Sequence, residues 1–310
     1  MTALEKTPDA HPASVRTLLK DRFFLKQRLD GVKCVYAVGD VHGQIDLLDA
    51  TLEMIRKDIA TLAADMPKTL IFLGDLIDRG NSRAVLQRLS GPWGIPGIGK
   101  RIIAGNHEGL FARFLAGPGP DFSQAPFGRT IAEEEYQADR LAYPEKLDRD
   151  MLLWISTDGG ADTLRNYGCS TWDPRLLPQE VARLRKIVLG NIPREHIGLL
   201  KRMEKMAAPG DFVFVHAGID PARPLDQQTW QDCGWIRKGF LNHKGGFEGR
   251  IVVHGHTPCK DPDIENDRLC LDTGAFLAGT LTWARFLDTK EYGTEVTVSQ
   301  VRRTAETPGP

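Results

Sequence analysis

The stretch LIFLGDLIDRG, residues 70–80, is a short apolar run that ends abruptly in glycine and aspartate. Five other stretches repeat this design: VYAVGDVHG (residues 35–43), IIAGNHE (102–108), FVFVHAG (212–218), IVVHGHT (251–257) and LCLDTGA (269–275). Runs of this length without polar alternation are typical of strands that are buried on both faces. The six stretches therefore predict a buried sheet whose strands each end in polar residues.

Helical patterns separate the early strands. Apolar residues at steps of three and four form one stripe along residues 45–62. Asn81 or Ser82 is suited to cap a second helix that runs through Leu89, and residues 197–206 suggest a further one. The succession of strand, loop and helix predicts a layered α/β domain.

The chain divides into three parts by pattern. Residues 1–30 are expected to be an N-terminal extension, in which Arg16 to Leu29 could form a helix. Residues 31–290 are expected to form the main domain, and residues 291–310 a C-terminal tail. Residues 111–150 break the rhythm of strands and helices, so they are expected to be an insertion beside the active cleft, a place where lids and recognition elements occur.

Composition bounds the class of protein. With 310 residues, 41% hydrophobic and 26% charged, the chain has the average make-up of a soluble globular protein and enough apolar residues for a sizeable core. Lys and Arg total 40 and Asp and Glu 41, which gives no electrostatic reason to expect nucleic-acid or membrane binding.

Cysteine usage and the chain start point to a compartment. The five cysteines are odd in number and none lies in a CxxC pair, which argues against a disulfide framework or a zinc–thiolate site. The N-terminus lacks a signal-peptide pattern, and no run approaches the ~20 apolar residues needed to span a bilayer. A cytoplasmic protein is therefore expected.

Polar side chains with metal-binding capacity follow the predicted strands. They are Asp40, His42, Asp75, Asp78, Asn106, His107, His216, His254 and His256. A single His or Asp in a turn is usually a cap or a satisfied polar group. Ligands, however, bind beyond the carboxyl ends of strands in open α/β sheets. Chance alone rarely places side chains of this kind at five strand ends of one chain.

The ligand types narrow the choice of metal. Carboxylate, imidazole and amide oxygen without thiolate suit Mn, Fe or Zn. Two ions about 3.5–4 Å apart need a bridging carboxylate, and Asp75, alone between two ligand-bearing strands, is the natural candidate. Gly39, Gly74 and Gly105 remove side chains where backbone and ion must approach closely.

The motifs GDVHG, GDLIDRG, GNHE, HAG and HGHT, in this order, resemble the signature set of the phosphoprotein phosphatase family within the metallophosphoesterase superfamily. The resemblance runs from about Val35 to Thr282. The segments HAGIDPARPLDQQ, GWIRKGF and LDTGAFLAGTLT are similar to its bacterial and phage branch. Single GDxxG motifs are weak signals, whereas the ordered set is very specific. It implies a layered α/β/β/α metallophosphoesterase sandwich with the metal site at the carboxyl ends of the strands.

The resemblance implies two divalent ions, with Mn favoured over Fe or Zn, and a role for each matching residue. Asp40 and His42 would hold the first ion, Asp75 would bridge, Asn106, His216 and His256 would hold the second, His107 paired with Asp78 would be the general acid, and Arg79 and Arg237 would bind phosphate. Physical reasons agree. Arg offers a forked donor set matched to phosphate oxygens, phosphoryl transfer relies on positioning and cationic stabilisation, and metals lower the pKa of a bridging water enough to supply hydroxide.

Some positions depart from the pattern or have competing readings. Of the two histidines in HGHT, the resemblance favours His256 as the ligand and leaves His254 an orienting or structural role. Pro258 stands where the superfamily has a further histidine. Residues 158–160, Asp-Gly-Gly, resemble a family Asn-Gly-Gly motif and are interpreted as a turn. Asp272 is expected to cap the backbone or to support the site.

The leading functional interpretation is a metal-dependent phosphomonoesterase, specifically a Ser/Thr protein phosphatase acting on a phosphorylated protein or a small phosphorylated substrate. The closest alternative is a diadenosine tetraphosphate hydrolase; these generally lack the Asp of GDxxDRG and carry GNHD, so Asp78 and Glu108 favour the phosphatase. The GNHE and DRG motifs and the balanced charge count against a nuclease or cyclic-nucleotide phosphodiesterase. A non-enzymatic scaffold predicts damaged motifs, yet all six expected ligands are present.

Overall fold

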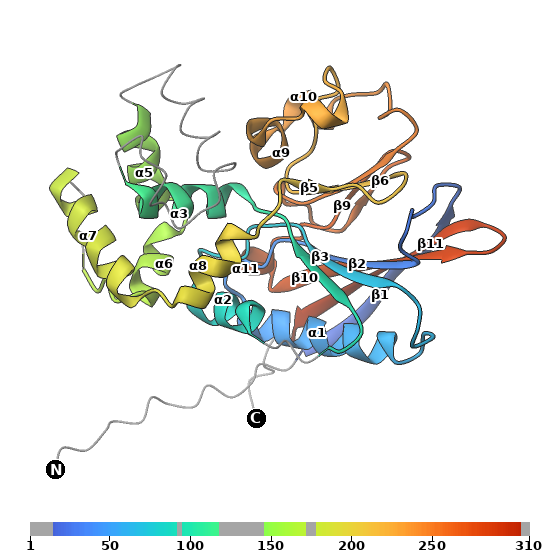
Figure 1. Cartoon of the computed structure of the whole chain (residues 1–310), viewed down its shortest axis with the longest axis horizontal. Coiled ribbons are helices and arrows are strands. Elements are labelled where there is room, and N and C mark those ends of the chain that lie inside the picture. The colour runs from blue at the N-terminus through green and yellow to red at the C-terminus, as the bar shows by residue number, and fades with distance from the viewer. Residues whose placement is uncertain (1–14, 92–94, 118–145, 172–177, 305–310) are drawn as a thin grey trace, which may run out of the picture.

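Two stacked sheets form the centre of the computed structural model, which describes residues 15–91, 95–117, 146–171 and 178–304 (Figure 1). The first sheet has the order β1 (Val15–Leu25), β11 (Gly293–Arg303), β10 (Thr280–Thr289), β2 (Cys34–Val38), β3 (Lys68–Phe72) and β4 (Gly99–Ile102). The second has the order β5 (Met206–Ala207), β6 (Phe212–Val215), β7 (Ile251–His254), β9 (Arg268–Cys270) and β8 (Asp263–Ile264). Within these sheets β2, β3 and β4 run parallel to one another, as do β6, β7 and β9.

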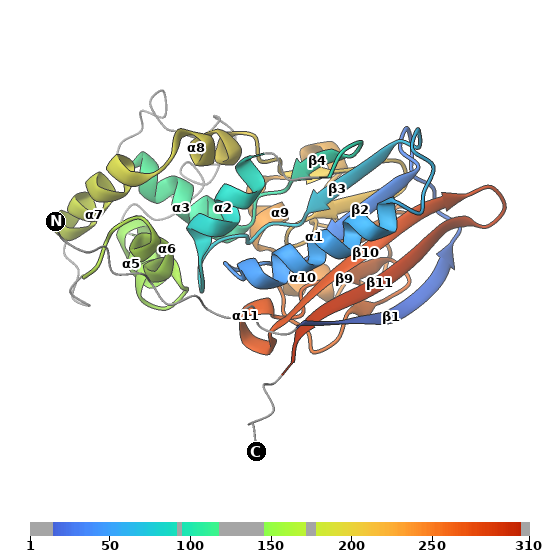
Figure 2. The same ribbon diagram turned by 90° about the horizontal axis from the view of Figure 1, so that it is seen from below.

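Helices cover the outer faces of this pair of sheets. Toward the first sheet lie α1 (Ile45–Ile59) and α2 (Ser82–Ser90), and at one end of the sheets lie α3 (Asn106–Ala116), α5 (Lys146–Ser156), α6 (Gly160–Asn166), α7 (Pro178–Asn191) and α8 (Arg194–Lys201) (Figure 1 and Figure 2). In Figure 2, α1 lies along this sheet, while α3 and α5 to α8 gather at one end. On the side of the second sheet lie the 3-10 turn η2 (Leu225–Gln227), α9 (Trp230–Trp235) and α10 (Lys238–Leu241), and the short α11 (Ala275–Ala278) precedes β10.

The buried apolar residues divide among three layers. In β2, Val35 and Ala37 face the cluster between the two sheets, whereas Cys34, Tyr36 and Val38 face the helices. The strand β6 alternates in the same way between the inter-sheet cluster and the cluster under α9 and α10. Because both faces of each central strand are covered, its sequence is apolar throughout. The predicted α/β/β/α sandwich is confirmed.

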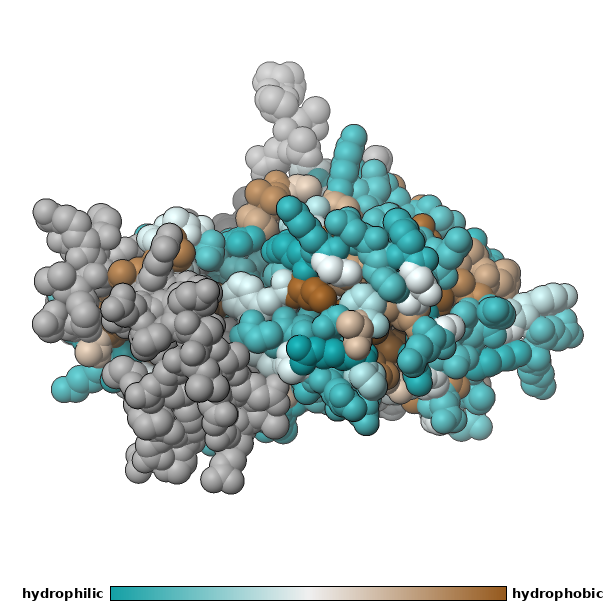
Figure 3. Space-filling model, turned by 90° about the horizontal axis from the view of Figure 1, so that it is seen from above, coloured by the Kyte–Doolittle hydropathy of each residue, from teal (hydrophilic) through white to brown (hydrophobic). Residues whose placement is uncertain are grey.

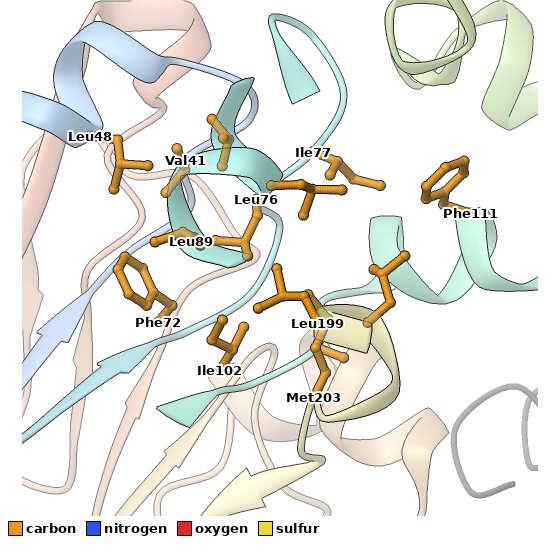
Figure 4. Packing of buried hydrophobic residues seen from close by; sticks show 14 of the residues in the cluster. Val41, Leu48, Phe72, Leu76, Ile77, Leu89, Ile102, Phe111, Leu199 and Met203 are labelled. Carbon is orange, nitrogen blue, oxygen red and sulfur yellow. The ribbon is translucent and has the colours of Figure 1, made fainter. Parts of the chain in front are cut away.

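The helix predictions for the early part of the chain are also confirmed. The Asn81 side chain caps α2 by accepting a hydrogen bond from the Ala84 N–H at 3.0 Å. Figure 4 shows Leu89 of α2 packed among Phe72 of β3, Ile102 of β4 and Leu199 of α8. These contacts fix α2 over the ends of β3 and β4, next to the loops that carry the candidate ligands.

The two chain ends differ from expectation. The predicted helix within residues 16–29 is wrong, because Val15–Leu25 form strand β1, which pairs antiparallel with β11 along its length. Alternate side chains reveal the strand: Phe23 and Leu25 pack against the inter-sheet cluster, whereas Phe24 is 50% exposed. The segments interpreted as an extension and a tail thus supply two neighbouring strands of the first sheet.

The predicted insertion at residues 111–150 lies mostly outside the described residues. Its first part, up to Ala116, continues α3, and its last part begins α5. None of the helices in the described ranges is long and apolar enough to cross a membrane. Seen from above, hydrophilic side chains cover most of the described surface (Figure 3).

The inter-sheet aromatic cluster yields a stability prediction. Phe286 of β10 makes edge-on contacts with Phe212 and Phe214 of the second sheet, both at 5.3 Å between ring centroids. We expect Phe286→Ala to lower the free energy of unfolding by about 3–5 kcal/mol, measured by chemical denaturation, because a fully buried ring leaves a cavity. Phe24→Ala, at a half-exposed ring, should cost less than about 1 kcal/mol. Equal losses in the two variants would contradict this account of the core.

Candidate active site

The residues predicted for the site meet where the two sheets bring their parallel strands to an end. The loop after β2 carries Asp40 and His42, and the loop after β3 carries Asp75, Asp78 and Arg79. The loop after β4 leads into α3, which begins with Asn106 and His107, while His216 follows β6 and His256 follows β7. All these side chains except that of Arg79 belong to buried residues.

The Asp75 carboxylate lies at the centre of this arrangement. Its Oδ2 atom is 3.6 Å from His42 Nε2, 3.4 Å from His216 Nε2 and 3.8 Å from His107 Nε2. A single carboxylate oxygen therefore faces three imidazoles that arrive from three different strand ends.

Two sets of possible metal ligands share Asp75. One set is His42, Asp75 and His107, the other is Asp75, His216 and His256, and the ligand atoms of each set lie within 4.8 Å of one another. Asn106 Oδ1 joins the second set, at 3.0 Å from His216 Nε2. A carboxylate common to two sets of imidazole ligands is the geometry that two neighbouring divalent ions require.

Buried polar atoms of Asp40 and His256 bear on whether the site fits such ions. Within the described residues, His256 Nε2 and Asp40 Oδ1 are buried and have no hydrogen-bond partner. The other Asp40 oxygen accepts the backbone N–H of His256 at 3.1 Å. Since buried polar atoms are normally paired, the orphaned Asp40 oxygen fits the role of a metal ligand. In His256 the atom beside the other ligands is Nδ1, which lies 3.1 Å from His216 Nε2. Asp40 itself lies outside the two compact sets and His107 inside one of them, which differs from the expected assignment.

Backbone carbonyls fix the orientation of two imidazoles. His42 Nδ1 lies 2.9 Å from the Ile77 carbonyl, and His216 Nδ1 lies 2.9 Å from the Leu73 carbonyl. Because a carbonyl only accepts, each Nδ1 carries a proton, and each Nε2 faces the Asp75 carboxylate. This is how ligating histidines are commonly oriented.

The backbone of the site is strained. Among non-glycine residues of the described chain, positive φ angles occur at Glu248 and at five site residues: His42, Asp75, Asp78, Arg79 and His256. Such conformations cost about 1–3 kcal/mol each and gather at functional sites. Gly105 and Gly255 also serve close approach, because a Cβ at either position would overlap the carboxylate of Asp75 or Asp40.

His107 forms a buried pair with Asp78, as predicted. Its Nδ1 lies 2.6 Å from Asp78 Oδ2, so that Nε2 is directed toward the Asp75 carboxylate. Burial alone would lower the pKa of His107, but the Asp75 and Asp78 carboxylates outweigh it and raise that pKa to about 9. The pair is therefore arranged to keep a protonated imidazole next to the candidate metal ligands.

The two predicted phosphate-binding arginines flank the ligands on different sides. The Arg79 guanidinium stacks on the Phe276 ring at 4.1 Å, and its Nη2 lies 3.5 Å from His107 Nε2. Arg237 Nη1 donates to the His256 carbonyl at 3.2 Å and to Thr257 Oγ1 at 3.0 Å. Both cations thus lie beside the ligand cluster, Arg79 half-buried and Arg237 exposed.

Two residues with open roles are explained by their contacts. His254 packs edge-on against the Phe240 ring at 4.9 Å, and burial lowers its pKa to about 4, so it is a neutral core residue outside the ligand cluster. Asp272 Oδ1 accepts the Gly274 N–H at 2.9 Å, which confirms the capping role. Sequence reasoning missed Trp154 and Thr163, which contact Asp78, and Phe276, which lies in the LDTGAFLAGTLT segment.

Comparison with known proteins gives a family and several relatives. A family described as calcineurin-like phosphoesterase matches residues 35–273. The chain is 26% identical over 254 residues to the bis(5'-nucleosyl)-tetraphosphatase PrpE (asymmetrical) of Bacillus velezensis, covering 80% of this chain and 87% of that protein. It is 26% identical over 257 residues to the same enzyme of Bacillus subtilis, covering 80% and 89%. A solved metallophosphoesterase of Sphaerobacter thermophilus aligns with a TM-score of 0.39 at 14% identity, covering 88% of this chain and 90% of that one.

The shared carboxylate leads to a prediction about metal content. We expect native protein to bind about two divalent ions per chain and Asp75→Asn to lower the occupancy of both, because it removes the charge between the two ligand sets. Elemental analysis of dialysed protein measures this. Asp272→Asn is the matched control, since that carboxylate caps Gly274 and should leave both ions bound. Loss of only one ion in Asp75→Asn would show that Asp75 serves a single ion.

Proposed function

The chain belongs to the calcineurin-like phosphoesterase family, and from this premise we propose that it hydrolyses dinucleoside polyphosphates at a site for two divalent ions. Family membership makes it a hydrolase of phosphoester bonds. The substrate class follows from the relatives named above, which carry the name of bis(5'-nucleosyl)-tetraphosphatases and match over most of their own length.

The observation that carries the proposed chemistry is the position of Asp75 between two sets of imidazoles. Asp40 and His42 would hold one ion, Asp75 would bridge, and Asn106, His216 and His256 would hold the other. When bound, two such ions neutralise charge on the phosphate and make a water molecule a better nucleophile at neutral pH. Mn, Fe and Zn all suit this donor set, and Mn is the ion we expect to support turnover best.

The chain's own residues would perform the remaining steps. Arg79 and Arg237, on two sides of the ligand cluster, would bind phosphate oxygens through their forked donors. His107 donates Nδ1–H to Asp78 and directs Nε2 toward the centre, where it would protonate the leaving oxygen. A positioned acid of this kind typically contributes about 10²–10⁴-fold in rate.

Phosphomonoesters of serine and threonine are the second candidate substrates. The observation in their favour is the buried His107–Asp78 pair, because an alcohol leaves as an alkoxide unless it is protonated. Glu108, by contrast, carries no substrate information. Its carboxylate accepts backbone N–H groups from Asp75, Leu76, Ile77 and Gly105 and so is used in holding the backbone. For the choice of substrate class, the named relatives therefore count for more than the GNHE motif.

A turnover panel tests this proposal. With Mn supplied, we expect diadenosine tetraphosphate to be hydrolysed to ATP and AMP with a kcat/KM at least about 10-fold above that for phosphoserine, phosphothreonine or phosphotyrosine peptides or pyrophosphate. The products distinguish asymmetric cleavage from cleavage to two ADP. Asp75→Asn, purified in parallel, controls for contaminating phosphatases. A higher kcat/KM on a phosphopeptide would make the chain a protein phosphatase instead.

Arg237 gives a second prediction for this site. If it binds phosphate, Arg237→Ala should lower kcat/KM by about 10–100-fold with metal content unchanged, the effect of losing a hydrogen bond to a charged group. Arg237→Lys should recover little, because an ammonium lacks the fork. The neighbouring exposed cation provides the control: Lys238→Ala should stay within about 2-fold. Full activity in the Lys variant would mean that only a positive charge is needed at position 237.

A further inference from the structure

The Asp78 carboxylate is held by more than its histidine. Its Oδ2 atom accepts the Trp154 Nε1–H at 2.7 Å in addition to the His107 Nδ1–H at 2.6 Å. Its Oδ1 atom accepts the Thr163 hydroxyl, and both Trp154 and Thr163 are completely buried. The carboxylate is therefore held by three side-chain donors, two that bind Oδ2 and one that binds Oδ1.

The hydroxyl hydrogen bonds around Asp78 have only one possible direction of donation. An ionised carboxylate only accepts, so the Thr163 hydroxyl must donate to it. The Ser82 hydroxyl, 2.7 Å from Thr163 Oγ1, must then donate to Thr163, while Ser82 Oγ accepts the Asp78 N–H at 2.8 Å. These bonds close a ring from the Asp78 backbone to its own carboxylate. The side chain is thus tied to a turn whose residues Asp78 and Arg79 both have positive φ.

The donors arrive from a part of the chain that the motifs do not include. Trp154 lies on α5 and Thr163 on α6, and the Asp-Gly-Gly turn at residues 158–160 joins these helices. A Cβ at Gly160 would overlap the Trp154 ring, and one at Gly159, where φ is 91°, would overlap the Arg79 side chain. The Asp-Gly-Gly turn therefore allows Trp154 and Thr163 to pack directly against the Asp78–Arg79 turn.

We propose that Trp154 and Thr163 are positioning residues that orient the Asp78 carboxylate, so that His107 presents a proton on Nε2 to the leaving group. In the step they support, the oxygen of a hydroxide ion forms a bond to phosphorus, the P–O bond to the leaving group breaks, and the leaving oxygen takes the Nε2 proton. His107 is left neutral, with its Nδ1 proton still donated to Asp78. This inference rests on the hydrolysis proposed for this site and adds the α5–α6 pair to the residues on which the acid depends.

Trp154→Phe tests the indole contact, because it keeps an aromatic ring and removes the N–H. We expect kcat/KM on phenyl phosphate, a poor leaving group, to fall by about 10-fold, and on p-nitrophenyl phosphate, which leaves without help, by less than about 2-fold. His107→Asn removes the acid itself and so gives the largest selective loss that is expected. The matched control is Trp283→Phe, since Trp283 is also buried and its Nε1 has no hydrogen-bond partner among the described residues.

Thr163 provides the conservative rescue. Thr163→Val keeps the shape and removes the hydroxyl, so it should repeat the selective loss, whereas Thr163→Ser restores the donor and should recover most of the activity on phenyl phosphate. Equal losses on both substrates in Trp154→Phe and Thr163→Val would assign these residues to packing alone. Unchanged ratios in both variants would also overturn the proposal.

A measurement without substrate separates this inference from the proposed function. The Nδ1 proton of His107 should give a downfield proton NMR signal in the Zn-loaded protein, identified by its loss in His107→Asn. We expect it to shift or broaden in Trp154→Phe and Thr163→Val and to stay unchanged in Trp283→Phe. An unaltered signal in the first two variants would refute the positioning role even if the enzyme acts on a different phosphoester. Absence of diadenosine tetraphosphate hydrolysis by the native protein would refute the proposed function alone.

Discussion

One buried carboxylate, that of Glu108, holds the site together. It accepts the backbone N–H groups of Asp75, Leu76 and Ile77 in the loop after β3 and of Gly105 at the start of α3. The loop with the shared carboxylate and the helix with two further site residues are thereby fixed to one another. Burial raises the pKa of Glu108 to about 7, and the N–H donors oppose that shift by stabilising its ionised form. The four backbone donors thus offset part of the cost of burying this carboxylate.

This anchor explains how the strained backbone persists. Five positive φ angles at non-glycine residues add up to several kcal/mol that the surroundings must offset. Leu76 and Ile77, which lie between Asp75 and Asp78 in the chain, point into the apolar cluster formed with α2 (Figure 4). A flexible loop would place the same ligands without strain but would not hold a carboxylate between two sets of imidazoles. The strained backbone therefore goes together with rigid placement of the ligands.

Sequence patterns predicted the parts of the structure that depend on local signals. Buried parallel strands are apolar throughout, and their polar ends stand out, so the convergence of Asp75, His216 and His256 could be inferred before any coordinates. Strand β1 was mistaken for a helix because its partner β11 lies at the far end of the chain, and no local pattern encodes such a partner. Trp154 was missed for a related reason: its contact with Asp78 spans 76 positions and follows no motif.

The same geometry bears on how a substrate is selected. A dinucleoside polyphosphate expels a phosphate oxygen that is stable as an anion, whereas a phosphoserine expels an alkoxide that requires the proton of His107. His107 pairs with an Asp78 carboxylate that also accepts hydrogen bonds from Trp154 and Thr163. An acid oriented in this way serves the more demanding reaction and does not hinder the easier one. Substrate choice therefore does not reside in the acid or in the metal ligands, which both reactions use. For the proposed function we expect substrate choice to depend on the flanks, where Phe276 and Arg79 border one side and Arg237 the other. Stacking on the Phe276 ring holds the Arg79 guanidinium in place, which would let this cation bind a phosphate of the substrate through its forked donors.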